Sequence, residues 1–174
     1  MAAAGAKAVI QPGGYPTKVW VNRNAYTGAL KQRSDAAVLE AALREEPDNT
    51  RYVFYLAQSY RDAGQWAKAR QQYARRMVMG GWDEEAWYAR YEFARLSERL
   101  GDAYPLVVSA YLDAYQARPQ RAESLTHLAS YFRARQEWHN AYLFARVAAE
   151  TPMTTDRLFV DVHTYAWRAL DELA

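Results

Sequence analysis

The sequence predicts an all-α fold, an α-solenoid of about three to four antiparallel helix hairpins that follows a short extended N-terminal arm. From residue 34 onward, Gly and Pro recur at intervals that fit helices joined by short links. Small and aromatic residues return at a nearly constant spacing along these segments. Aromatic residues are abundant, with 14 Tyr, 6 Trp and 5 Phe, and most of them lie after residue 50. Together these observations indicate stacked helices rather than a sheet.

The first segment, residues 1–33, is expected to be an extended arm ahead of a tetratricopeptide-like helical repeat domain at residues 34–174. It contains Gly13, Gly14, two prolines and the alternating stretch Lys18 to Val21, which has the period of one strand. A lone strand has no partner to pair with inside the arm. The arm is therefore expected to lie on the helical body, to dock on a partner, or to be loose.

Start and stop signals predict about eight helices in the remaining chain. Their expected ranges are 34–43, 49–62, 65–79, 83–100, 105–117, 121–135, 137–150 and 156–173. Asp83 opens the fourth helix, with Glu84 and Glu85 in its first turn, where the helix dipole favours carboxylates. Gly64 and Gly101 end the second and fourth helices.

An internal repeat accounts for the regular spacing of the helices. Ala57, Ala94 and Ala129 occupy the same position in three successive segments. After Ala57 come an aromatic residue, a Gly, a second aromatic residue and an Ala at the spacing of the tetratricopeptide pattern, and the segment after Ala129 repeats this with Gln136 where Gly is usual. One hairpin of this kind leaves its apolar face open, so the hairpins are expected to stack. A generic helical bundle with chance alanine spacing is the alternative.

Several longer segments are more specific than the repeat itself. They are Arg51–Asp62, Gly80–Glu85, Tyr111–Tyr115, Arg118–Glu123, Ala141–Ala145, Leu158–Val160 and Tyr165–Glu172. In this order they resemble the helical repeat region that follows the catalytic domain in some bacterial family-two glycosyltransferases, over residues 35–174. Here only a short arm precedes the repeats, and no Asp-x-Asp metal motif occurs. The resemblance therefore implies either an accessory part of such an enzyme or a free-standing repeat protein, and it assigns no transferase residue.

Composition and motifs exclude several function classes. A net charge of +2 from 22 basic and 20 acidic residues leaves little attraction for nucleic acid. The sequence has no Cys for thiolate chemistry, and His127, His139 and His163 lack the spacing of a metal site. It also has no Gly-rich phosphate loop or long apolar span, and its first residues lack the pattern from which a signal peptide would be expected. We therefore expect a cytoplasmic protein without cofactor, metal, membrane span or catalytic residues.

The groove formed by the first helix of each hairpin is the best candidate for binding. Alignment on the three alanines predicts the groove-facing residues Arg51, Phe54, Gln58 and Arg61 in one unit, Tyr88, Tyr91, Arg95 and Glu98 in the next, and Thr126, Ser130 and Arg133 in the third. Guanidinium groups interleaved with Tyr suit recognition of carboxylates and polar chains. The alternative is that these arginines are solvated or paired with Glu98, Asp62 and Glu123 across units.

The leading hypothesis is a non-catalytic helical-repeat module that binds a protein or peptide, in the context of a glycosyltransferase. One alternative is a structural subunit of a larger assembly that docks through the N-terminal arm. Another is the part of a glycosyltransferase that binds a saccharide acceptor, with exposed Trp and Tyr side chains stacked on sugar rings. An oligomer is compatible with each of these hypotheses.

Overall fold

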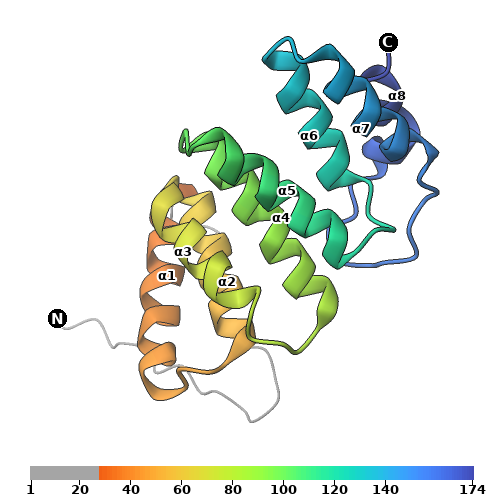
Figure 1. Ribbon diagram of the computed structural model, residues 1–174. Coiled ribbons are helices and arrows are strands. Elements are labelled where there is room, and N and C mark those ends of the chain that lie inside the picture. Colours follow the sequence, from red (N-terminus) through yellow and green to blue (C-terminus); the bar gives the residue numbers. More distant parts are fainter. Residues whose placement is uncertain (1–27) are drawn as a thin grey trace, which may run out of the picture.

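A computed structural model of the protein describes residues 28–174, with side chains from residue 35 onward (Figure 1). Across this range the chain is all-α and contains no strand. Its helices are α1 (Gly28–Glu45), α2 (Thr50–Asp62), α3 (Trp66–Arg76), α4 (Asp83–Arg99), α5 (Tyr104–Ala117), α6 (Glu123–Ala134), α7 (Trp138–Glu150), the π-helical turn η1 (Thr164–Arg168) and α8 (Ala169–Asp171). None of these described helices is long and apolar enough to cross a membrane.

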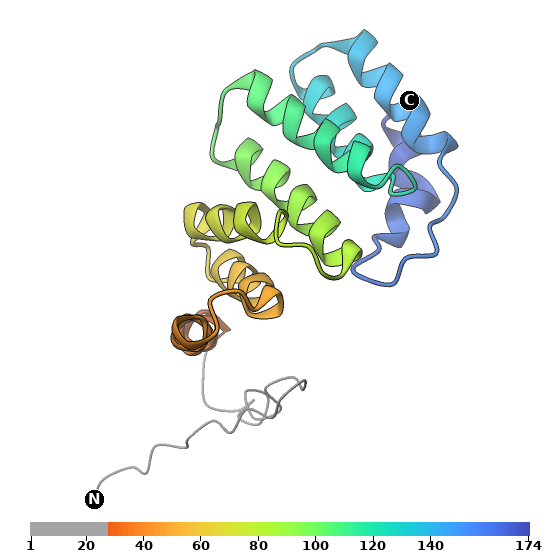
Figure 2. The ribbon, with the colours of Figure 1, turned by 60° about the horizontal axis from the view of Figure 1, so that its bottom comes forward.

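The helices pack in chain order. Each helix from α1 to α7 contacts the next one along the chain, and α1 and α7 lie at opposite ends of the row (Figures 1 and 2). The most extensive contacts join α2 with α3, α4 with α5, and α6 with α7. After α7 the chain returns, and η1 and α8 pack against α6 and α7.

The ends of α2, α4 and α6 share one backbone geometry. Gly64, Gly101 and Gln136 adopt left-handed conformations, with φ of 73°, 73° and 63°. In each case the next residue donates its N–H to a carbonyl in the last turn of the helix, so that position 65 donates to 60, 102 to 97 and 137 to 132. This helix-ending turn favours Gly, because a side chain at positive φ clashes with the backbone. Gln136 makes the same turn at a steric cost.

The three repeat alanines lie in tightly packed contacts between helices. Ala57, Ala94 and Ala129 are all fully buried, because a methyl side chain lets two helices approach closely. Aromatic side chains fill much of the remaining interior. Of the leucines and aromatic residues in the repeat segments, Leu56, Tyr60, Tyr73, Leu128 and Phe132 are buried, and Phe93 and Phe144 are partly buried.

The first helix begins before the expected boundary at residue 34. α1 starts at Gly28, so residues 28–33 are helical and do not belong to an extended arm. Their sequence after Gly28 contains Ala, Leu, Lys, Gln and Arg, which all have high helix propensity. The rest of the expected arm, residues 1–27, lies outside the described residues.

The expectation of one helix over residues 156–173 is wrong for its first part. Residues 152–161 have no helical structure, and we call this segment the strap. Phe159 has a φ of 47°, which a right-handed helix excludes. The N–H groups at positions 157, 158 and 161 donate to the carboxylates of Glu84 and Glu123 instead of to helix carbonyls. The strap thereby runs from the end of α7 back to α4 before the chain turns into η1 (Figure 2).

Candidate functional site

Helices α2, α4 and α6 share one face of the molecule, which we call the inner face. The strap crosses one part of it, because Phe159 contacts Phe54 of α2 and Tyr88 of α4. Farther along the strap, the N–H of Asp161 donates to Glu123 at the start of α6. Another part of the same helices is open and forms a cleft. The inner face therefore has a covered part and an open part.

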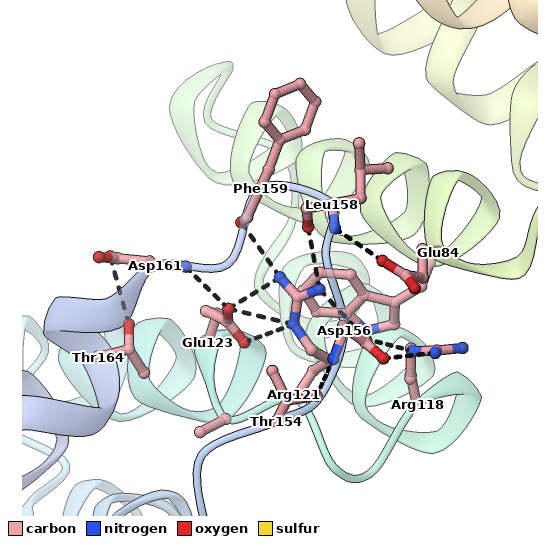
Figure 3. Close-up of polar contacts among 12 residues, drawn as sticks. Glu84, Arg118, Arg121, Glu123, Thr154, Asp156, Leu158, Phe159, Asp161 and Thr164 are labelled. Carbon is pink, nitrogen blue, oxygen red and sulfur yellow. Dashed lines mark hydrogen bonds and ion pairs between the residues drawn. The ribbon is translucent and has the colours of Figure 1, made fainter.

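A buried arginine holds the strap (Figure 3). Arg121, in the link between α5 and α6, is fully buried, and its guanidinium donates to Glu123 with contacts of 2.9 to 3.1 Å. The same group donates to the carbonyl oxygens of Leu158 and Phe159 at 3.2 Å and to Asp156 at 3.3 Å. Burial by itself lowers the pKa of Arg121, but the hydrogen bonds and charge of Glu123 hold it above its usual value. The buried charge is thus both paired and hydrogen-bonded.

Two further charged side chains bind the strap near its start. Oε2 of Glu84, in the first turn of α4, accepts two consecutive backbone N–H groups, from Arg157 at 2.8 Å and from Leu158 at 2.7 Å (Figure 3). Arg118 donates to both oxygens of Asp156, at 2.5 and 2.6 Å. These hydrogen bonds lower the pKa of Asp156 against the effect of burial. Because both donors are main-chain N–H groups, Glu84 recognises the backbone of the strap, which bends at Leu158 and Phe159, rather than a particular side chain.

The strap places one aromatic side chain on the inner face. The ring of Phe159 lies 4.8 Å from that of Tyr88 and 6.4 Å from that of Phe54, at 22° to the latter. We call the surface formed by Phe54 and Tyr88 the aromatic slot. Both slot residues are buried, whereas Phe159 itself is 50% exposed. Phe159 occupies the slot with a φ of 47°, which costs a residue other than Gly about 1–2 kcal/mol.

The open cleft has a volume of about 610 Å³. Its floor contains a buried carboxylate, Glu92, which accepts a hydrogen bond from Arg95 at 2.6 Å and lies 3.5 Å from Arg61. Arg61 also donates to the hydroxyl of Tyr88 at 2.9 Å, which connects the cleft to the slot. The cleft is lined by Arg61, Asp62, Trp66, Glu92, Arg95, Leu96, Glu98, Arg99, Tyr111 and His127.

The remaining cleft wall combines aromatic and polar groups. Glu98 accepts a hydrogen bond from the hydroxyl of Tyr111 at 2.6 Å, and His127 stacks on Tyr111 with the ring centroids 6.3 Å apart. Burial, together with the charges of Arg95 and Arg168, lowers the pKa of His127 to about 4. The imidazole is therefore neutral at neutral pH. The cleft lining contains both hydrogen-bond donors and acceptors, which suits a polar ligand.

The predicted groove residues fall into three settings. Arg61, Arg95 and Glu98 line the open cleft. Four others are buried, namely Phe54, Tyr88, Tyr91 and Thr126, and Gln58 and Ser130 are half-buried. Arg51 and Arg133 are not among the cleft-lining residues. The structure thus brings only part of the predicted set together in one cleft.

Each predicted groove arginine has a carboxylate neighbour. The two cleft arginines share one glutamate, as described above. Arg51 lies 3.5 Å from Glu85, with its guanidinium over the ring of Trp82. Arg133 pairs with Glu172 in the C-terminal tail at 2.7 Å. Each of these arginines therefore pairs with a carboxylate. Of the partners expected from the sequence only Asp62 is among those observed, and it is the neighbour of Arg61 in the chain rather than a residue of another unit.

Sequence reasoning missed the residues that hold the strap. The pair Glu84 and Glu85 reads as two helix-opening carboxylates, but Glu84 binds the strap and Glu85 pairs with the buried Arg76 at 3.1 Å. Arg121 and Glu123 lie in a short segment that carries several charges between two helices. Charged residues in a link are ordinarily solvated, so nothing in this segment of the sequence signals a buried ion pair.

Among residues 35–174 there is no group of three or more His, Asp or Glu side chains that could hold a metal ion. The cleft carboxylates Glu92 and Glu98 already accept hydrogen bonds from arginine and tyrosine. No protein-family model matches the chain, and no curated protein matches it either. The function of the protein is therefore inferred from its fold and from the inner face.

Proposed function

We propose that this protein is a non-catalytic helical-repeat module that binds an extended peptide segment of a partner protein along its inner face. The proposal includes a tetratricopeptide-like solenoid of antiparallel hairpins. Two recurring features support it: the buried alanines at 57, 94 and 129, and the helix-ending turns at 64, 101 and 136, which follow them at a constant distance. Recurrence of both features in step is typical of stacked repeats.

The observation that carries the proposal is the strap. An extended stretch of the chain contacts α2, α4 and α6, with its backbone bound by Glu84 and Arg121 and its Phe159 ring packed against the slot. Main-chain hydrogen bonds combined with a pocket for one side chain are a common mode of peptide recognition. We infer that the open cleft accepts a further stretch of extended chain from a partner.

The charges of the cleft support a peptide as the ligand. The Arg95 side chain is 44% exposed although one of its nitrogens bonds Glu92, so further guanidinium donors are accessible from the cleft. Glu98 adds a carboxylate acceptor to the same wall. A peptide backbone presents carbonyl acceptors and N–H donors together, and it matches this mixture better than a simple anion does.

Selection of a random peptide library on the immobilised full chain tests the proposal. Selected peptides are then titrated against the wild type, Arg95→Ala and the control Arg146→Ala, which changes an exposed arginine of α7 that does not line the cleft. We expect Arg95→Ala to weaken binding about tenfold, as the loss of a charged hydrogen bond does. The control should bind like the wild type. The proposal fails if no peptide is selected, or if the two substitutions have the same effect.

A saccharide ligand is the second candidate, in keeping with the glycosyltransferase resemblance. Trp138 and Tyr142 of α7 are 60% and 55% exposed and lie one turn apart on the same helix face. Exposed rings in such an arrangement can stack on sugars. The test is titration of the full chain with oligosaccharides while its Trp fluorescence is followed, in the wild type and in Trp138→Ala. A response that survives in Trp138→Ala, or no response in the wild type, argues against this candidate.

A further inference from the structure

We propose that the aromatic slot is a recognition site for an aromatic side chain of an incoming peptide, and that Phe159 is the occupant that this peptide displaces. The inference rests on the proposed peptide-binding function and specifies the chemistry of the partner. That partner is a non-helical peptide with an aromatic residue preceded by two residues other than proline, whose backbone can bend at the aromatic residue.

The strap is held at its base by an ion pair between side chains, and at its tip by backbone hydrogen bonds and one ring contact. At the base, Arg118 makes two hydrogen bonds of 2.5 and 2.6 Å to Asp156, whose side chain is 5% exposed. At the tip, Phe159 is 50% exposed and has a φ of 47°. When the tip leaves, Arg121 still has Glu123 and Asp156 as partners, so no buried charge is left alone. The tip can therefore leave the slot while the base remains bound.

The slot retains every group that binds the tip. Phe54 and Tyr88 supply the aromatic surface. Glu84 accepts the N–H groups of the two residues before Phe159. Arg121 donates to the carbonyl of Phe159 and to that of the residue before it. A second peptide can restore these bonds only when its backbone takes the same bent conformation, with a positive φ at the aromatic residue.

These contacts define which peptides fit. A proline at either position before the aromatic residue removes an N–H group that Glu84 binds. The near-parallel arrangement with Phe54, at 22°, favours a flat ring over an aliphatic side chain, because aromatic pairs gain energy beyond the area that they bury. The slot therefore selects for an aromatic residue through its side chain, and the two backbone-binding groups select for a non-helical backbone that bends at this residue.

A labelled peptide with the sequence of residues 152–161 tests the inference. Its binding to the full-length wild type and to full-length Phe159→Ala is measured by fluorescence anisotropy. In the wild type the strap competes from within the same chain, at an effective concentration in the millimolar range. Because Phe159→Ala removes the ring of that competitor, we expect the variant to bind the peptide at least about tenfold more tightly. Equal affinities, or no binding to the variant, would overturn the inference.

Three controls assign the binding to the slot. A peptide with Ala in place of Phe159, and one with Pro in place of Leu158, should each bind Phe159→Ala about tenfold less tightly, since each loses a contact that the slot provides. The chain with Phe54→Leu added to Phe159→Ala should also lose affinity, with its helix content checked by circular dichroism. If Phe54→Leu unfolds the chain, the binding of the two altered peptides alone tests whether the slot is the binding site. Undiminished binding of both would overturn the inference.

The test separates the slot from the cleft. One outcome is that library peptides bind the chain and Arg95→Ala weakens that binding, while the labelled peptide does not bind Phe159→Ala. This outcome would overturn the inference about the slot and leave the proposed function standing. Failure of both experiments would remove both proposals. Binding of the labelled peptide, combined with weaker binding of its two altered forms, supports the slot whether or not the cleft selects a ligand.

Discussion

The guanidinium of Arg121 lies over the indole of Trp87, with its central carbon 3.9 Å from the ring centroid. Trp87 in turn stacks on Tyr91 at 5.3 Å and donates its indole N–H to the carbonyl of Ala114 at 2.9 Å. Arg121 therefore connects the aromatic interior of α4 with the strap that crosses the inner face. A desolvated cation over an indole contributes about 2 kcal/mol or more, in addition to the ion pair with Glu123.

Replacement of this arginine should destabilise the fold strongly. Arg121→Met keeps much of the side-chain volume but leaves Glu123, which is 1% exposed, without its cationic partner. We expect a loss of about 3–5 kcal/mol in the free energy of unfolding, as for other broken buried pairs. Urea denaturation measures it, with the exposed Arg146→Met as the matched control. A similar small effect of both substitutions would show that the buried pair adds little to stability.

Loss of Glu84 should release the strap without unfolding the helices. Glu84→Ala removes the acceptor of two consecutive strap N–H groups. Hydrogen bonds to a charged group contribute about 1.5–3 kcal/mol, so trypsin should cleave after the exposed Arg157 at least about tenfold faster. Asp83→Ala removes the same charge from the same helical turn and serves as the control. Equal cleavage rates in the two variants would contradict the assigned role of Glu84.

His127 should make the protein less stable in mild acid. Its pKa is lowered to about 4 by burial and by Arg95 and Arg168, whereas an unfolded His titrates near about 6.5. Between these values the unfolded chain binds more protons, so stability falls as the pH decreases from about 6.5 toward 4, by about 3 kcal/mol at most. His127→Gln should show a flatter pH dependence over this interval, measured by urea denaturation at several pH values. If the stability of both proteins depends on pH in the same way, the imidazole of His127 is more solvated than the structure indicates.

The repeat alanines should not tolerate larger side chains. Ala57→Leu and Ala129→Leu insert volume into fully buried contacts and should each cost about 1–3 kcal/mol. Ala67→Leu, on the exposed side of α3, is the control and should leave the melting temperature nearly unchanged. Unchanged melting of both buried variants would mean that the alignment of the repeats is incorrect.

Gln136→Gly should stabilise the protein. Gln136 has a φ of 63° in a turn where the equivalent positions are Gly64 and Gly101, and Gly removes a strain of about 1 kcal/mol there. The same change at Gln71, exposed within α3, should instead destabilise by about 1 kcal/mol. Chemical denaturation measures the change in the free energy of unfolding for both variants. Changes of opposite sign would confirm the turn geometry, and changes of the same sign would contradict it.

Local signals account for most of the helices. Capping residues, Gly and Pro mark the limits of α2 to α7 to within a few residues, because these features act over a single turn. Alignment of the repeat segments on the three alanines also predicts Arg61, Arg95 and Glu98 as groove residues, and these three line the cleft. It does not identify Trp66, Arg99 or His127, since these reach the cleft from positions outside the predicted face.

The strap could not be predicted in this way. The sequence of residues 156–161 is compatible with a helix, and its extended form depends on bonds to Glu84 and Glu123, which are distant in the chain. Only the fold brings these carboxylates to the backbone of the strap. For the same reason, Glu84 reads from its local sequence as a helix-opening residue, although it is a ligand for main-chain N–H groups.

The strap also changes how the molecule should fold and unfold. Contacts between neighbouring helices are local in sequence, whereas the strap joins residue 84 to residue 158 and residue 54 to residue 159. Contacts of high contact order form late, because a long loop must close first. Once formed, they link the stability of α2 to that of the C-terminal helices. We therefore expect the whole chain to unfold in one cooperative transition. A row of repeats without such a long-range contact would instead unfold progressively from one end.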